Sequence, residues 1–102
     1  MKDFFQGDII KINGYKPLFL VISKNSFIKN EGMFHVCPIV NTDSINPLHI
    51  EIKGKAGSEG TAICEEIKLI DPEARICSKV DRINYGQIMY ISDALQSVFE
   101  YD

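Results

Sequence analysis

The sequence lacks tryptophan and any apolar run long enough to cross a membrane. A bilayer-spanning helix needs about 20 consecutive apolar residues, so we expect a protein that does not enter a membrane. The first seven residues, Met1 to Gly7, carry an acid and a glycine where the apolar core of a signal peptide would lie. These absences predict a cytoplasmic protein.

Cysteine is also scarce. Cys37, Cys64 and Cys77 are odd in number, form no Cys-x-x-Cys pair and lie within apolar runs. This pattern is typical of reduced, buried thiols and excludes a disulfide framework. We expect no metal site and no cofactor.

The chain has no excess of positive charge. Its 11 lysines and arginines stand against 14 acids, which gives a net charge of -3. Bulk electrostatics therefore cannot hold nucleic acid, and any such contact has to be local. The 102 residues, 45% of them apolar, suffice for one modest core. We expect a single domain over residues 1–102.

Short apolar or alternating segments separated by turn residues predict six strands, at 9–12, 17–22, 33–40, 48–53, 61–70 and 76–80. Asn13-Gly14 predicts a hairpin between the first two strands. The polar segments 23–32 and 41–47 are expected to be loops. Pro38 cannot donate to a ladder and so indicates a sheet edge, a strand end or a bulge. Short strands with tight turns favour a small β-barrel.

The last part of the chain changes its period. Apolar side chains recur at helical spacing at Ile88, Ile91, Leu95, Val98 and Phe99. This pattern predicts an amphipathic helix over 84–99, with Asn84 as N-cap and Gln87 completing a partial capping box. The predicted fold is therefore mainly β with a C-terminal helix.

The stretch from Gly54 to Asp71 is where chemistry is most strongly indicated. Three glycines lead into a run that holds Glu65 and Glu66 among apolar neighbours. In a strand over 61–70, alternation places Glu65 on the core-facing side. Desolvation there raises the pKa of a carboxyl, unless a cation or hydrogen-bond donors stabilise its charged form. A salt-bridged acid at a sheet edge explains the same pattern.

Four segments resemble motifs of a known protein family: Gln6-Gly7-Asp8-Ile9, Gly14-Tyr15-Lys16-Pro17, Cys37-Pro38-Ile39 and Gly60 to Asp71. Together they resemble the MazF/PemK-type toxins of bacterial toxin-antitoxin pairs over most of the chain. The second segment is similar to the family's Gly-x-Arg-Pro motif. The fourth is similar to its Gly-led strand with an acid-Gln/Glu pair and a terminal Ile-Asp, and this match is the most specific.

The resemblance implies an SH3-like barrel of the MazF/PemK/CcdB type, usually a homodimer, inhibited by a cognate antitoxin. It also implies a metal-independent, sequence-selective endoribonuclease in which the RNA 2'-oxygen attacks its own phosphate. Such a reaction needs a base, a cation or donors for the phosphorane oxygens, and an acid for the leaving oxygen. Lys16 stands where the family's motif arginine stands, and Glu65 where its strand acid stands. Lys16 would stabilise charge, while Glu65 would act as base or orient one.

The remaining predicted site residues are weaker candidates. Asn41 or Thr42 would supply an amide or hydroxyl at the catalytic site. Tyr15, Lys24 and Lys29 are candidate RNA-binding residues, by base stacking or by local positive charge. A solvated lysine at a strand start is the bland alternative for Lys16.

Other residues are left out of the predicted site. His49 is expected to face outward and His35 inward, and neither is assigned to catalysis. Cys64 lacks a nearby partner in the sequence that would mark a nucleophile. Arg75, Lys79 and Arg82 could contact phosphates, although a solvated face interleaved with acids explains them as well.

Departures from the family pattern keep other functions open. Lys16 lacks the bidentate fork of an arginine. Val40 stands where the family has a catalytic threonine or serine, the first loop is cut to three residues, and Ile63 replaces an additional arginine that some members carry. The main alternative is a catalytically degenerate barrel of the same family that binds protein or nucleic acid. An SH3-type domain for Pro-rich ligands would need a cluster of exposed aromatics.

Overall fold

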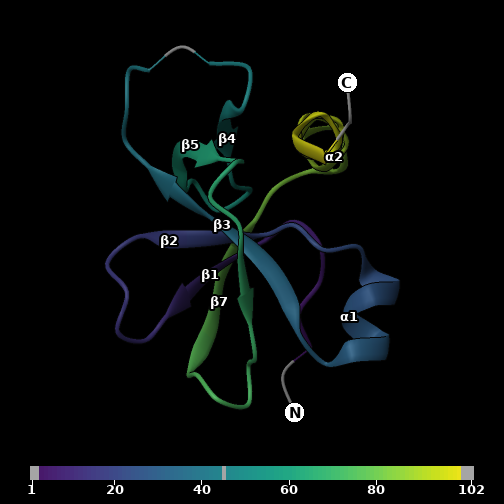
Figure 1. Ribbon diagram of the computed structural model, residues 1–102. Helices are drawn as coiled ribbons and strands as arrows, with labels where there is room; N and C mark the ends of the chain where they lie inside the picture. Colours follow the sequence, from purple (N-terminus) through teal and green to yellow (C-terminus); the bar gives the residue numbers. More distant parts are fainter. Residues whose placement is uncertain (1–2, 45, 100–102) are drawn as a thin grey trace.

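A computed structural model describes residues 3–44 and 46–99. Met1 and Lys2 of the predicted N-terminal segment, and Ile45 of the predicted loop 41–47, lie outside the described residues. The elements, in chain order, are β1 (Asp8–Ile12), β2 (Leu18–Val21), α1 (Asn25–Glu31), β3 (Phe34–Val40), β4 (His49–Lys53), β5 (Glu59–Ile63), β6 (Lys68–Ile70), β7 (Cys77–Arg82) and α2 (Tyr85–Phe99) (Figure 1).

The strands form one antiparallel sheet in the order β4-β5-β3-β2-β1-β7, and β6 pairs with β3 beside β5. The expected fold, mainly β with a C-terminal helix, is confirmed. The terminal strands of this path, β4 and β7, do not pair with each other in the described part of the chain. The barrel is therefore open between them. In the same part of the chain, no helix has the length and apolar character of a membrane span.

The first hairpin and the predicted strand at 17–22 are also confirmed. β1 pairs with β2 through Ile9 and Leu20, and the turn between them holds Gly14 at a φ of 92°. Leu20 packs in one core cluster with Ile91 of α2. Its neighbour Phe19 packs in a second cluster on the other side, with Ile28 of α1 at the margin. β2 is apolar throughout because both of its faces are covered.

Helix α2 begins as predicted. The Asn84 Oδ1 accepts a 2.9 Å hydrogen bond from the Gln87 backbone N–H, so Asn84 is the N-cap. The Gln87 side chain was predicted to complete the capping box, and this prediction is wrong. The Gln87 amide instead accepts from the Lys53 N–H at 2.9 Å and donates to the Lys53 carbonyl at 3.1 Å. A primary amide carries the same donor and acceptor as a backbone unit, so it extends the ladder at the free edge of β4.

The predicted loop 23–32 is wrong, because residues 25–31 form α1. The helix ends at Gly32, whose left-handed φ of 69° lets its N–H donate to the Ile28 carbonyl. Phe27 packs against His35 with ring centroids 5.1 Å apart. Seven mostly polar residues carry too little apolar periodicity to predict a helix, and the glycine C-cap was the available signal.

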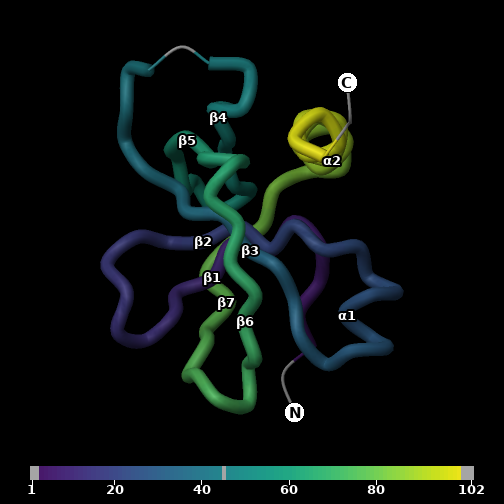
Figure 2. Tube along the Cα trace, viewed as in Figure 1, coloured from purple at the N-terminus to yellow at the C-terminus, as the bar shows by residue number. Residues whose placement is uncertain are grey.

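The predicted strand 61–70 is interrupted. Ile39 of β3 pairs with Ala62 of β5, whereas Val36 pairs with Lys68 of β6. Three residues separate the two positions on β3 but six separate their partners, so three extra residues leave the ladder between β5 and β6. Figure 2 shows the chain passing from β5 across β3 to β6. Glu65 lies in this turn and not on a core-facing strand.

Pro38 lies at the same interruption. It sits within β3, opposite Phe19 of β2, and not at a strand end. On the other side of β3, the β5 pairing stops at Ile39 and the β6 pairing starts at Val36. The residue that lacks a backbone N–H thus falls where the ladder is broken, which fits the bulge among the predicted alternatives.

A single carboxylate joins the two open ends of the sheet. Asp81 of β7 accepts hydrogen bonds from the backbone N–H groups of Ala56 at 2.8 Å and Ser58 at 3.0 Å, in the β4–β5 turn. The Lys55 N–H donates to the Arg82 carbonyl at 2.9 Å. Gly54 permits this approach, because a Cβ there would overlap the Asp81 carboxylate. The predicted glycine-rich turn is therefore a docking point for Asp81.

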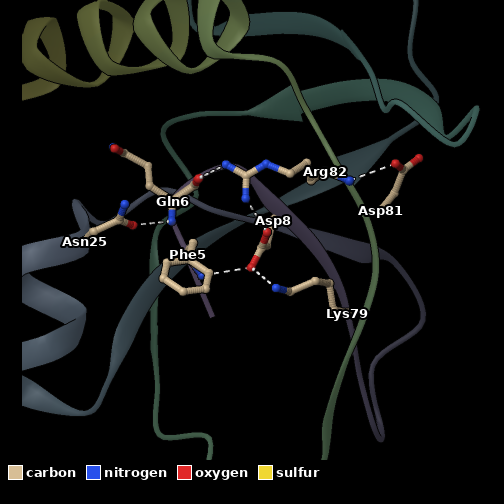
Figure 3. A network of polar contacts seen from close by, with 7 residues as sticks. All are labelled: Phe5, Gln6, Asp8, Asn25, Lys79, Asp81 and Arg82. Carbon is tan, nitrogen blue, oxygen red and sulfur yellow. Dashed lines mark hydrogen bonds and ion pairs between the residues drawn. The ribbon is translucent and has the colours of Figure 1, made fainter. Parts of the chain in front are cut away.

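A second buried carboxylate fixes the start of the chain (Figure 3). Asp8 is fully buried and receives Arg82 Nη1 at 2.9 Å, Lys79 Nζ at 3.0 Å and the Phe5 N–H at 2.8 Å. Arg82 also donates to the Gln6 carbonyl at 3.1 Å. Lys79 and Arg82 thus pair with a buried carboxylate, which differs from the solvated face expected for them.

All three cysteines are buried and carry free thiols, as predicted. Cys37 and Cys64 belong to the cluster beneath α2, and Cys77 to the cluster on the other side.

Asp81 generates a prediction on stability. Burial disfavours its charge, but the Ala56, Ser58 and Arg82 donors outweigh burial and hold the pKa of Asp81 well below its usual range. A depressed pKa stabilises the fold above the unfolded value near 4, and that stability is lost as the pH falls through the folded pKa. We expect Asp81→Asn to lower Tm at pH 7 by on the order of 5 °C, with a smaller difference at pH 2. Thermal melts by circular dichroism measure this; equal Tm values at pH 7 would contradict it.

Candidate active site

Glu65 projects from the β5–β6 turn and meets a histidine. Its Oε2 lies 2.9 Å from Nε2 of His49, the first residue of β4. The Glu66 N–H donates to the Ile63 carbonyl at 3.1 Å and tightens the turn. The Glu65 side chain is 39% exposed, so one side of the carboxylate contacts protein and the other faces solvent.

Of the two alternatives for Glu65, a pKa raised by desolvation and a charged form stabilised by a partner, the second holds. Desolvation is the largest single effect and raises the pKa, but the residue's own backbone N–H and the His49 side chain together outweigh it and lower the pKa of Glu65 below its ordinary value. Glu65 is therefore a carboxylate at neutral pH. It can accept a hydrogen bond or orient a partner, and it takes up a proton only weakly.

His49 is the residue that sequence reasoning missed. Its side chain is only 15% exposed, and its Nδ1 is buried without a hydrogen-bond partner among the described residues. It was expected to face outward because it alternates with Ile50. The available signal was the glycine turn, since a β4–β5 hairpin centred there pairs His49 with Ile63, two residues before Glu65.

Two thiols lie beneath this pair. The β3–β5 register, continued by two residues from Ile39 and Ala62, brings Cys64 opposite Cys37. A hydrogen bond to Cys64, together with burial, raises the pKa of the Cys37 thiol well above its usual value. Cys37 is thus a neutral packing residue at physiological pH.

Lys16 lies in the β1–β2 turn with its ammonium exposed, and it forms no ion pair within residues 3–44 and 46–99. The β2–β3 register pairs Leu18 with Ile39, which directs Lys16 toward the end of β3 that Asn41 follows. Cys37, beside the Glu65 turn, is four residues further back on β3, roughly 13 Å at the usual rise per residue. Lys16 and Glu65 are thus not in contact, and a substrate would have to bridge them.

Asn41 and Thr42 line a polar cleft of about 580 Å³ between the end of β3, the β4–β5 hairpin and α2. The Thr42 hydroxyl already accepts the Ser44 N–H at 3.1 Å. The charged residues of the cleft are Asp43, Glu51, Glu59 and Lys53. Three acids against one lysine disfavour a phosphate inside this cleft.

The predicted RNA-binding residues lie apart. Tyr15 is half-buried, packs edge-on against Phe19 and carries the Arg75 guanidinium 5.2 Å above its ring. Lys24, the N-cap of α1, and Lys29 within α1 are exposed, and α1 lies at the other end of β2 from the β1–β2 turn (Figure 1). The structure therefore brings only Tyr15 near Lys16.

A larger pocket of about 740 Å³ lies between the N-terminal segment, α1 and the β6–β7 turn. Phe4, Ile28 and Phe34 supply apolar surface, and Lys29 is the one predicted site residue that lines it. No cluster of three or more histidine, cysteine or acidic side chains suited to a metal occurs in the described ranges.

The sequence identifies the family to which this arrangement belongs. Residues 6–99 match the sequence model of the PemK-like, MazF-like toxins of type II toxin-antitoxin systems. The chain belongs to this family. The match spans Lys16, Glu65 and His49, so all three lie within the family domain.

Solved structures agree on the fold. A MazE-MazF complex from Deinococcus radiodurans contains a chain with a TM-score of 0.82 at 15% identity, covering 96% of this chain and 97% of that one. MazF from the same organism gives 0.78 at 16% identity, with 94% and 97% coverage. An endoribonuclease in complex with its cognate antitoxin from a mycobacterial species gives 0.78 at 12% identity, with 98% and 100% coverage. A search of curated proteins finds no significant match.

Proposed function

We propose that this chain is the toxin of a type II toxin-antitoxin pair and acts as a metal-independent, sequence-selective endoribonuclease. The observation that supports this most directly is Glu65. It stands at the position of the family's strand acid, and His49 holds it half-exposed at 2.9 Å. Lys16, in the β1–β2 turn, forms no ion pair with the described residues and supplies the positive charge that a scissile phosphate needs.

The chemistry follows from these groups. The RNA 2'-oxygen attacks the adjacent phosphorus, its proton passes to a base, and the bond to the 5'-oxygen breaks as that oxygen gains a proton. Lys16 stabilises the charge on the phosphorane oxygens as a point charge. Glu65 accepts the 2'-hydroxyl hydrogen or orients the group that does. Asn41 or Thr42 supplies a further donor at the end of β3. Tyr15, Lys24 and Lys29 contribute contacts to the RNA outside the reacting phosphate.

The partners follow from the same proposal. Chains of this fold occur in complexes with MazE or with a cognate antitoxin. We infer that this chain likewise binds an antitoxin, forms a homodimer and works in the cytoplasm on RNA.

One observation favours a second function. Val40 carries no hydroxyl, and the cleft next to it is acidic and so repels phosphate. A barrel that has lost catalysis would bind a protein or nucleic acid through its surface. Activity measurements separate this function from the first.

The first test is induced expression of the intact chain beside Lys16→Ala and Glu65→Gln. Both side chains are exposed and make at most one surface ion pair, so each substitution is expected to change stability by less than about 1 kcal/mol. We expect growth arrest and discrete new 5'-hydroxyl RNA ends with the intact chain. Each variant should lose cleavage by about 100-fold or more. Continued growth without new ends, from protein that is folded by circular dichroism, would favour the binding module.

The family departures predict a gain of activity. Lys16→Arg restores a bidentate grip on phosphate, and Val40→Thr restores a hydroxyl at the half-buried end of β3. We expect Lys16→Arg alone to raise the cleavage rate several-fold and the double variant to raise it further. Lys55→Arg in the β4–β5 turn, an exposed lysine with no assigned role in the site, is the matched control and should leave the rate unchanged. Equal rates for Lys16→Arg and the unmodified chain would show that Lys16 does not contact the reacting phosphate.

A further inference from the structure

We propose that His49 is a positioning residue: as a neutral imidazole it donates its Nε2–H to Glu65 and fixes that carboxylate toward the RNA. The role rests on the proposed ribonuclease function and adds to it a residue of this chain that belongs to none of the four family-like segments.

The burial of the imidazole selects its tautomer. Nε2 lies 2.9 Å from the Glu65 Oε2, and an ionised carboxylate only accepts hydrogen bonds, so Nε2 has to be the donor. Nδ1 is buried without a partner among the described residues. A proton on Nδ1 would be a buried, unpaired donor, which is costly, whereas a bare Nδ1 is an unprotonated acceptor. Of the two neutral tautomers, the one with its hydrogen on Nε2 is therefore favoured.

The same geometry excludes direct proton transfer from His49 to a substrate. One ring nitrogen is buried and the other is occupied by Glu65, and the whole side chain is 15% exposed. The Glu65 carboxylate, at 39% exposure, is the group that an RNA can reach. His49 thus acts through Glu65.

Glu65 needs such support because of where it lies. It projects from a turn outside the β3 ladder, so no cross-strand neighbour restricts its rotamers. His49 is anchored in β4, whose pairing with Ile63 fixes its position. A rigid neighbour contributes to catalysis by holding a reacting group within a fraction of an ångström of its productive position.

Within residues 3–44 and 46–99, no lysine or arginine forms an ion pair with Glu65 or shifts its pKa. The charged or titratable groups that interact with it are His49 of β4, Cys37 of β3 and the adjacent Cys64. Glu66 is its neighbour in the turn. Loss of the His49 donor would therefore leave the Glu65 backbone N–H as its remaining stabilising contact.

The test compares His49→Gln, His49→Phe and the control His35→Gln. Glutamine keeps an N–H near the position of Nε2, and phenylalanine keeps a ring without a donor. His35 lies on β3 and is hydrogen-bonded to Ser23, so it serves as a histidine outside the Glu65 contact. Two readouts are needed: kcat and KM for RNA cleavage, and the pKa of the Glu65 carboxyl by carbon-detected NMR titration.

We expect His49→Phe to lower kcat at least 10-fold with KM within about twofold, and to raise the pKa of Glu65. His49→Gln should recover most of kcat, and His35→Gln should match the unmodified chain. Full activity of His49→Phe overturns the positioning role. Equal loss in His49→Gln and His49→Phe also overturns it, because proton transfer by the imidazole itself would then be required.

The outcome separates this role from the proposed function. An unmodified chain that cleaves no RNA refutes the ribonuclease, and the positioning role with it, even if the Glu65 pKa shifts. An unmodified chain that cleaves RNA, beside a fully active His49→Phe, refutes only the positioning role.

Discussion

The carboxylate of Asp81 is the contact on which the rest of the barrel depends. The sheet path runs from β4 to β7 without a ladder between these two strands in the described chain, and Asp81 joins them through the backbone of the β4–β5 turn. Gly54 gives it room. Because His49 is carried on β4, the closure that Asp81 makes also sets the position of His49 relative to the rest of the sheet.

A change of register along β3 places the other half of the site. Residues 64–67 form a turn between β5 and β6 that adds three residues relative to β3, and Pro38 lies at the matching gap in β3. Without the change of register, Glu65 would continue the strand. With the change of register, the carboxylate leaves the ladder and meets His49. Glu65 and His49 are thus positioned by two separate features: the bulge in the β3 ladder places Glu65, and the register of the β4–β5 hairpin places His49.

Under the proposed function, the charge distribution would limit where RNA could lie. The cleft of Asn41 and Thr42 is acidic, whereas Lys16, on the β1–β2 turn, forms no ion pair with the described residues. A phosphate is therefore more favourable on the Lys16 flank than within the cleft. Lys24 and Lys29 lie on another side of the barrel, where they would meet only a long or curved RNA.

Most of the fold could be predicted from the sequence because hydrophobic period is a local property. The first hairpin, the apolar β2, the alternating β4 and the cap of α2 at Asn84 all follow from it. Two of the predictions failed for different reasons. The helix α1 was missed because it is too short and polar for a periodic signal. The break after Ile63 was missed because it depends on non-local pairing with β3. Glu65 stays a predicted site residue, and its environment could not be predicted, because His49 reaches it only through tertiary register.

The central claim is that this barrel cleaves RNA through its own side chains. The most direct measurement is incubation of the purified chain with RNA in excess chelator, followed by mass spectrometry of the fragment ends. Attack by the 2'-oxygen predicts fragments with 2',3'-cyclic phosphate and 5'-hydroxyl ends, formed at the same rate with and without chelator. Fragments with 3'-hydroxyl and 5'-phosphate ends, or no cleavage by folded protein, would contradict the claim.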